Sequence, residues 1–234
     1  MIFNMILPQP EKKEVVMNKM SITTSSRTGT FVFNGIDHIP KFFVFFKEGT
    51  ETTGTPANTA WMIHHNNETK TCTVSSTNSS STISFAWYDE TVYNASIENG
   101  NLKIVVTTIP ASTYSLYYTD DTINSKTVTV SNRTGTGYLV FDGVTQSDTS
   151  KFLLLAHTSD TITSATKLSN QPAYWLRAEN NVIQRRAYSS SSSYDVSIRT
   201  TTGSNEITEG YPTTGLSFTR SNYMVAGDYT IYYA

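Results

Sequence analysis

Apolar residues after position 20 fall into short runs and alternations that are typical of β-strands. Continuous runs occur at Phe42–Phe46 and Trp61–Ile63, and Leu102–Val106 is broken only by a lysine. Apolar and polar residues alternate at the start of Thr82–Tyr88 and in Tyr114–Leu116. Turn formers such as Asn-Gly and Asp-Gly separate these segments at roughly 8–12 residues, as in a sandwich or barrel. Since no segment of helical length has a helical apolar period, the sequence predicts an all-β chain.

Several sequence features recur in the same order in the two halves of the chain. Arg27-Thr-Gly-Thr30 recurs as Arg133-Thr-Gly-Thr136, Val32-Phe-Asn-Gly35 as Val140-Phe-Asp-Gly143, Lys41-Phe42 as Lys151-Phe152, and Tyr114-Ser-Leu-Tyr-Tyr118 as Tyr229-Thr-Ile-Tyr-Tyr233. Ala187–Ile198 also aligns without gaps on Ala86–Ile97. The halves differ in polar stretches interpreted as loops, at Ser75–Thr82, Ser189–Ser193 and Thr200–Gly215. A period this long indicates a duplicated domain rather than a solenoid repeat.

The repeat predicts two tandem duplicated β-sandwich domains, immunoglobulin-like or of a similar topology. We place them at residues 21–121 and 122–234, after an extended N-terminal arm over residues 1–20. A chain of 234 residues suits two domains of roughly 100 residues each. The arm either folds back on its own domain or docks on a neighbouring subunit of a large assembly. The short, polar linker around Thr119–Lys126 predicts a preferred orientation of the two domains.

The composition argues against several classes of partner. The formal net charge is −2 and charged residues make up 15% of the chain, so the basic face that nucleic acids require is not expected. Cys72 is the only cysteine, which excludes an intrachain disulfide and a thiolate-built metal site. No apolar run is long enough to span a bilayer, and the apolar start Met1–Leu7 lacks the flanks of a secretory signal. We expect neither a nucleic-acid nor a membrane partner.

Residues that could perform catalysis are present, but not in catalytic patterns. The histidines are His38, His64, His65 and His157. Adjacent histidines on a strand point to opposite faces and cannot bind one metal ion together. The carboxylate pairs Asp89-Glu90 and Asp120-Asp121 lie at predicted turns, where Asp is an ordinary residue. No nucleophile elbow, phosphate loop or metal motif occurs. We therefore predict a non-enzyme with no catalytic, cofactor-binding or metal-binding residues.

Aromatic residues are the remaining candidates for ligand binding. Trp61 and Trp175 belong to segments that are aromatic in both halves, which favours core positions. Trp87 and Tyr88 lie at a strand end where the other half has serines, so both a core role and a sugar-stacking role remain open. The alternation in the repeated tyrosine phrase predicts that Leu116 and Ile231 are buried.

In composition and architecture, the whole chain resembles the accessory structural proteins of tailed-phage virions, of the capsid-decoration or tail and fibre type. Such proteins combine tandem β-sandwiches rich in Ser, Thr, Asn and Tyr with an extended arm. The resemblance implies a non-enzymatic protein of the virion without cofactors, which decorates or bridges capsid or tail subunits as a homo-oligomer or part of a large assembly. Its arm would bind the partner through Ile2, Phe3, Met5, Ile6, Leu7, Pro8 and Pro10. The alternative is a glycan-binding or adhesin module of a phage fibre or cell surface, with Trp87 and Tyr88 at its site.

Overall fold

The computed structural model of the chain is all-β, which confirms the predicted class. It describes residues 14–48, 59–77, 80–87, 94–109, 111–131, 137–158, 161–162, 171–178, 181–189, 194–199, 208–220 and 227–234, and these contain no helix. Their strands are β1 (Asn18–Thr23), β2 (Thr28–Phe33), β3 (Phe42–Glu48), β4 (Thr59–His65), β5 (Glu68–Thr77), β6 (Ser80–Trp87), β7 (Asn94–Glu98), β8 (Asn101–Ile109), β9 (Thr113–Thr119), β10 (Asn124–Val130), β11 (Gly137–Asp142), β12 (Phe152–His157), β13 (Thr161–Ile162), β14 (Gln171–Ala178), β15 (Asn181–Ser189), β16 (Tyr194–Arg199), β17 (Thr208–Gly210), β18 (Gly215–Arg220) and β19 (Gly227–Tyr233).

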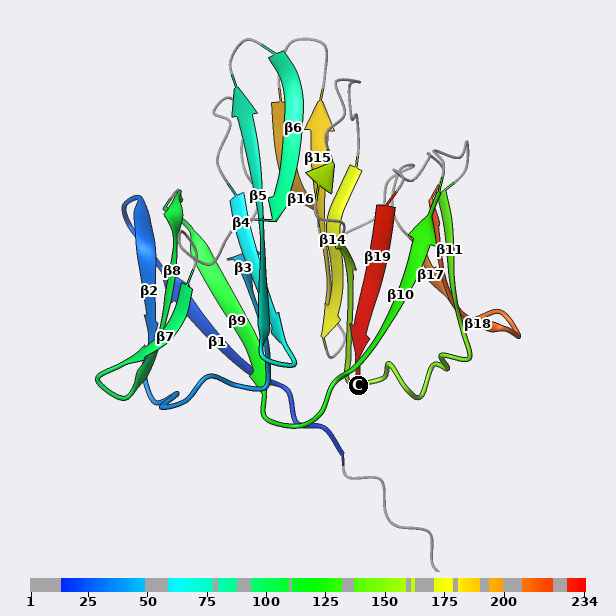
Figure 1. Cartoon of the computed structure of the whole chain (residues 1–234), viewed down its shortest axis with the longest axis horizontal. Helices are drawn as coiled ribbons and strands as arrows, with labels where there is room; N and C mark the ends of the chain where they lie inside the picture. Colours follow the sequence, from blue (N-terminus) through cyan, green and yellow to red (C-terminus); the bar gives the residue numbers. More distant parts are fainter. Residues whose placement is uncertain are drawn as a thin grey trace, which may run out of the picture.

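The described strands form four antiparallel sheets (Figure 1). The first large sheet has the order β1-β9-β3-β4-β5-β6-β13, and the second large sheet has the order β10-β19-β12-β14-β15-β16. The first small sheet is β2-β8-β7, and the second small sheet is β11-β18-β17. The large sheets lie next to each other in the middle of Figure 1, and the small sheets lie outside them.

The two halves share one strand order. Each strand of the first half has a counterpart in the second. The second half has one further described strand, β13, which pairs with β6 and extends the first large sheet. The register agrees as well: Val44 pairs with Tyr117, and Leu154, two residues after Phe152, pairs with Tyr232. Positions in the two halves can therefore be matched one by one from the strand pairing.

The two large sheets pack face to face through one apolar cluster, which we call the central core. The first half contributes Phe42, Val44, Phe46, Ile63, Tyr117 and Ile123, and the second contributes Phe152, Leu154, Ala156, Leu176, Ala178 and Tyr232. Burial of apolar side chains is the main stabilising term in such an interface. The central core therefore holds the two halves in one orientation, in keeping with the short linker.

A separate apolar cluster joins each small sheet to its large sheet. In the first half, Phe43 and Phe45 of β3 pack with Phe31 and Phe33 of β2. In the second half, Leu153 and Leu155 of β12 belong to the corresponding cluster with Trp175 and Phe218. The molecule is thus a stack of four β layers, and both faces of each large sheet carry buried residues.

Burial on two faces explains the unbroken apolar runs in the sequence. Alternate residues of a strand point to opposite faces, so Phe42, Val44 and Phe46 enter the central core while the phenylalanines between them enter the outer cluster. The run from Phe152 to Ala156 is divided in the same way. A strand between two apolar layers needs apolar residues at every position, as buried parallel strands also do.

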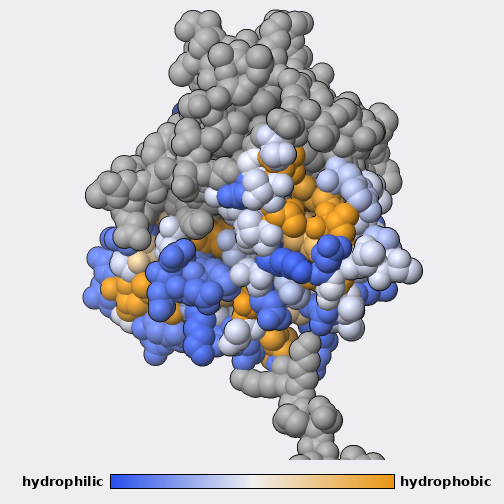
Figure 2. All heavy atoms as spheres, turned by 45° about the vertical axis from the view of Figure 1, so that its right-hand side comes forward, coloured by the Kyte–Doolittle hydropathy of each residue, from blue (hydrophilic) through white to orange (hydrophobic). Residues whose placement is uncertain are grey.

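Three predicted core positions are confirmed. Leu116 and Ile231 are fully buried on β9 and β19, and Trp175 is buried on β14. The side chain of Trp61 lies outside the described side chains. Among the described residues the large exposed apolar side chains are Val16, Val32, Ile39, Ile97 and Tyr138. On the face shown in Figure 2, hydrophilic side chains separate the apolar areas into several patches.

Parts of the sequence alignment of the two halves are wrong. The alignment of Ala187–Ile198 on Ala86–Ile97 matches β15 and β16 with β6 and β7, whereas the sheets match β16 with β6 and β17 with β7. Two segments interpreted as loops contain strand residues. Thr200–Gly215 contains β17, and Ser75–Thr82 contains the end of β5 and the start of β6. The predicted boundary at residue 20 falls inside β1, which pairs with β9 from Asn18 onward.

Candidate functional site

A polar pocket opens beside the central core, where the two halves of the chain meet. We call it the junction pocket. Its volume is about 280 Å³. Its lining consists of Ile63, His65, Asn66 and Glu68 from the first half and Ser125, Thr127, Thr230 and Tyr232 from the second.

The β4–β5 hairpin supplies the wall of the pocket from the first half. His65 and Glu68 are paired at its end, and the two residues between them, Asn66 and Asn67, have φ angles of 52° and 63°. Asparagine tolerates this left-handed conformation better than most residues, and two such residues in succession make the tight turn favoured in hairpins. The hairpin thereby brings an imidazole and a carboxylate to the pocket.

His65 is fixed in place by the second half and by the linker. Its Nε2 lies 3.1 Å from the carbonyl oxygen of Ile123. Because a carbonyl oxygen can only accept, Nε2 carries the hydrogen and donates. Its ring meets the Tyr232 ring edge to face, with 5.2 Å between centroids. The imidazole is therefore a rigid part of the pocket wall.

The wall from the second half is a ladder of hydroxyl groups on β10 and β19. Ser125 pairs with Tyr232 and Thr127 with Thr230, so these side chains point to the same face of the sheet. Thr127 Oγ1 and Thr230 Oγ1 share a hydrogen bond of 2.9 Å, and Thr230 Oγ1 also lies 2.7 Å from Thr158 Oγ1. The ladder presents hydroxyl oxygens, each of which can both donate and accept.

The electrostatics of the pocket are set by one carboxylate and one buried phenol. Burial, and to a smaller extent the negative charge of Glu68, raises the pKa of Tyr232 to about 12. The phenol is therefore neutral at physiological pH. Among the residues that line the pocket, Glu68 is the one carboxylate, whereas glycoside hydrolysis generally needs a facing pair. The lining can bind a polar or cationic group but does not present that pair.

Ser125 of the second half is matched by a lysine, Lys19, in the first half. Lys19 pairs with Tyr117 as Ser125 pairs with Tyr232. The Lys19 ammonium lies over the Tyr117 ring, 5.4 Å from its centroid, and 2.6 Å from Glu48 Oε1. Burial alone would lower the pKa of Lys19, but Glu48 and Tyr117 outweigh it and raise the pKa. On this side of the central core, the protein therefore covers its tyrosine with its own cation.

Residues 14–17, which we call the proximal segment, contact both halves near the linker. Val15 and Met17 pack against the central core, and the backbone N–H of Val16 donates to Asp121 Oδ2 at 3.1 Å. Glu14 forms an ion pair with Lys151 of the second half, which lowers the pKa of Glu14. The proximal segment is thus tied to the first half, the linker and the second half.

The two aspartates of the linker have different partners. The His38 imidazole donates from Nδ1 to Asp37 (2.8 Å) and from Nε2 to Asp120 (2.9 Å). Two donating nitrogens require the protonated ring, and these hydrogen bonds raise the pKa of His38. Asp120 therefore fastens the linker to the first half, while Asp121 holds the proximal segment.

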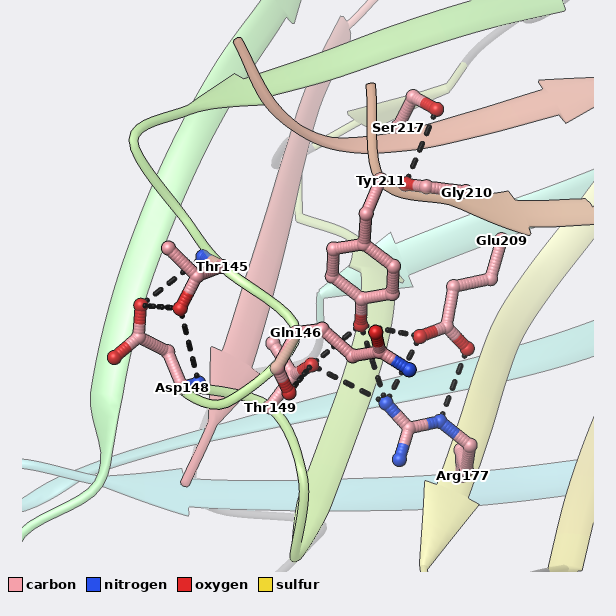
Figure 3. A network of polar contacts seen from close by, with 9 residues as sticks. All are labelled: Thr145, Gln146, Asp148, Thr149, Arg177, Glu209, Gly210, Tyr211 and Ser217. Atoms are coloured by element: carbon pink, nitrogen blue, oxygen red, sulfur yellow. Dashed lines mark hydrogen bonds and ion pairs between the residues drawn. The ribbon is translucent and has the colours of Figure 1, made fainter. Parts of the chain in front are cut away.

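A polar network joins the second large and second small sheets (Figure 3). Arg177 of β14 contacts both oxygens of Glu209 on β17, at 3.0 Å from Nε and 2.9 Å from Nη2. Nη2 also lies 3.2 Å from Thr149 Oγ1, and the Tyr211 hydroxyl donates to Glu209. Arg177 and Glu209 are only 17% and 15% exposed. This carboxylate is neutralised by a bidentate partner, so we interpret the network as a clamp between sheets.

The residues predicted from sequence as binding sites are not among those just described. Ile2, Phe3, Met5, Ile6, Leu7, Pro8, Pro10 and Tyr88 lie outside the described residues. Trp87 ends β6, and its side chain lies outside those described. The sequence did not reveal the junction pocket because its residues come from four strands and the β4–β5 turn and form no linear motif.

Within the described parts of the chain, no three His, Cys, Asp or Glu residues are grouped to hold a metal ion. The same parts contain no helix long and apolar enough to cross a membrane. The chain matches no family model, no curated protein and no solved structure.

Proposed function

We propose that the chain is a non-enzymatic structural protein of a virion, which decorates or bridges capsid or tail subunits and is anchored by its N-terminal arm. The observation that carries the proposal is the position of the proximal segment. Residues 14–17 are held by Lys151, Asp121 and the central core. A force applied to the preceding arm would therefore be transmitted to both halves. This attachment suits an anchor better than a loose tail.

The proposal includes a duplicated architecture of two immunoglobulin-like β-sandwiches. The matching strand orders of the two halves support it. So do the reciprocal contacts of the central core, in which Phe42 meets Tyr232 and Phe152 meets Tyr117. In a two-fold interface, each residue of one half contacts the counterpart of the residue that its own counterpart contacts.

The rigidity of the four-layer body supports a mechanical role. Three apolar clusters connect the layers in series, and the Arg177–Glu209 pair adds a polar clamp in the second half. A load applied at the proximal segment is therefore transmitted through packed sheets rather than through a flexible hinge. The resemblance to accessory virion proteins supplies the identity of the assembly.

The test compares the full chain with a variant lacking residues 1–13, which keeps the contacts of the proximal segment with Lys151, Asp121 and the central core. Each is expressed with the particle of the virus that encodes the chain, and gradient-purified particles are analysed by quantitative mass spectrometry. We expect full-length protein at a fixed copy number and loss of the truncated protein. Val32→Thr, a change at an exposed position of β2, is the control and should be retained. Normal incorporation of the truncated protein would refute anchoring by the arm, and absence of both proteins would refute the virion role.

A further inference from the structure

We propose that the junction pocket binds a primary ammonium group on an alkyl chain, carried either by a lysine side chain of a partner protein or by a free alkylamine. This inference does not depend on the virion role. It follows from comparing the junction pocket with its counterpart on the other side of the central core.

At the matched position in the first half, the protein already binds an ammonium group of its own. Lys19 extends across the face of Tyr117 and ends at Glu48. An ammonium over an aromatic face and beside a carboxylate gains both cation–π and ion-pair energy. In the first half, the surface beside the matched tyrosine therefore accommodates an alkylammonium group.

Among the described residues that line the junction pocket, none is a lysine or arginine. Ser125 replaces the lysine, and its short side chain leaves room beside Tyr232. Thr158 stands at the position matched to Glu48, and its hydroxyl is already bonded to Thr230. The acidic group is supplied instead by Glu68 on the β4–β5 hairpin. The space and the negative charge of Glu68 both remain, while the described lining contains no lysine.

The acceptors of the junction pocket match the donors of an ammonium ligand. An ammonium has three N–H donors and no acceptor. The Glu68 carboxylate and the hydroxyl oxygens of Thr127 and Thr230 can accept from it, and the apolar side of the pocket at Ile63 suits an alkyl chain. Glu68 disfavours an anion such as phosphate, and a neutral alcohol or sugar gains no ionic attraction.

The experiment uses the full chain and follows the NMR signals of His65 and Tyr232 during titration with n-butylammonium. We expect saturable shifts with a dissociation constant on the order of 1 mM. 1-Butanol and glucose are the neutral controls and should not saturate. Nα-acetyl-lysine methylamide and 1,5-diaminopentane distinguish the two sources: tighter binding of the first indicates a protein lysine, and tighter binding of the second indicates a free amine.

Two variants test whether the site is the junction pocket. Ser125→Lys should fill it with an internal ammonium and abolish binding, whereas Ser131→Lys, which adds the same charge at an exposed position, should leave binding unchanged. Glu68→Gln should weaken binding about fivefold. The proposal is overturned if n-butylammonium produces no saturable shift, if the Ser125→Lys protein, folded by circular dichroism, binds as well as wild type, or if glucose binds instead. That last result would favour the glycan-binding alternative.

Discussion

The rings of Phe42 and Phe152 meet edge to face at the centre of the molecule, with 5.4 Å between their centroids. The two residues are matched in the halves, so the contact joins a position to its own counterpart. On either side, Phe42 lies 5.8 Å from Tyr232 and Phe152 lies 6.3 Å from Tyr117. These contacts are reciprocal between matched positions, as contacts across a two-fold interface are.

Phe42→Ala should destabilise the whole chain rather than one half. Phe42 is fully buried, and truncation of a buried phenylalanine costs about 3–5 kcal/mol. Urea denaturation followed by fluorescence and circular dichroism should show one shifted transition. The double variant with Phe152→Ala should reveal a coupling of about 1 kcal/mol. Two separate transitions, with only one shifted, would contradict a shared core.

Removing one partner of the Arg177–Glu209 pair should destabilise the whole chain, although the pair lies in the second half. Arg177→Met leaves the Glu209 carboxylate poorly solvated, at a cost of about 3 kcal/mol in the free energy of unfolding. The double variant Arg177→Met with Glu209→Leu should recover much of this loss, because no unpaired charge remains. Arg177→Lys keeps the charge but loses the bidentate fork and should fall between them. Equal stability of the Arg177→Met protein and wild type would show that the clamp contributes nothing.

The pKa values of His38 and His64 should move in opposite directions from the ordinary value of 6.5. Hydrogen bonds to Asp37 and Asp120 raise the pKa of His38, so its stabilising effect is complete below pH 6.5 and is lost as the pH rises through the raised value. Burial, with the nearby His65, lowers the pKa of His64. Stability that depends on neutral His64 is therefore complete above pH 6.5 and is lost as the pH falls through the lowered value.

An NMR titration of the imidazole signals measures both pKa values directly. His38→Gln should remove the loss of stability on the alkaline side while leaving the acid side unchanged. A His64 that titrates above pH 6.5 would contradict its burial as a neutral ring.

Gly215→Ala should be far more harmful than Gly143→Ala in the same β11–β18 region. At Gly215 φ is +151°, and a Cβ would lie 2.4 Å from the carbonyl oxygen of Phe141. Backbone strain and steric overlap together should cost about 3 kcal/mol or more. Gly143 also has a positive φ but has open space around it, so alanine there should cost about 1 kcal/mol. Thermal denaturation of the two variants provides the comparison, and equal losses would argue against the overlap.

Two truncations should distinguish the contribution of the arm to the free energy of unfolding from that of the proximal segment. Removal of residues 1–13 should leave the free energy of unfolding unchanged, whereas removal of residues 1–17 also takes away Val15 and Met17, which are partly buried on the central core. The additional loss should be about 1–3 kcal/mol, measured by urea denaturation. If both truncated proteins are equally stable, the proximal segment does not contribute to packing.

The sequence predicts strands well where burial leaves a strong pattern. Phe42–Phe46 and the run after Phe152 lie between two apolar layers, and the repeated tyrosine phrase marks β9 and β19. Edge strands leave a weaker pattern. Asn18–Thr23 and Thr208–Gly210 have few apolar residues, and their partners Thr113–Tyr118 and Ser217–Thr219 do not identify them by sequence alone. The incorrect alignment of Ala187–Ile198 arose because a few shared Ala, Tyr, Ser and Ile residues can match in several strand registers.

The junction pocket depends on the packing of the two large sheets, which strand patterns do not encode. The contrast between Lys19 and Ser125 has a meaning only after the pairings with Tyr117 and Tyr232 are known. The sequence alone does predict that adjacent residues of a strand point to opposite faces of the sheet. For example, His64 and His65 were expected to point to opposite faces, and their contacts with Phe43 and Phe42 respectively agree with this.

The short strand β13 also bears on the order in which the protein folds during synthesis. Thr161 and Ile162 pair with Ala86 and Phe85 at the edge of the first large sheet, although they follow the linker by many residues. The ribosome must therefore synthesise well into the second half before this edge can be covered. Until then, the nascent first half exposes both the outer edge of β6 and the side of β3 that later enters the central core. Chaperones or neighbouring chains can act on these surfaces.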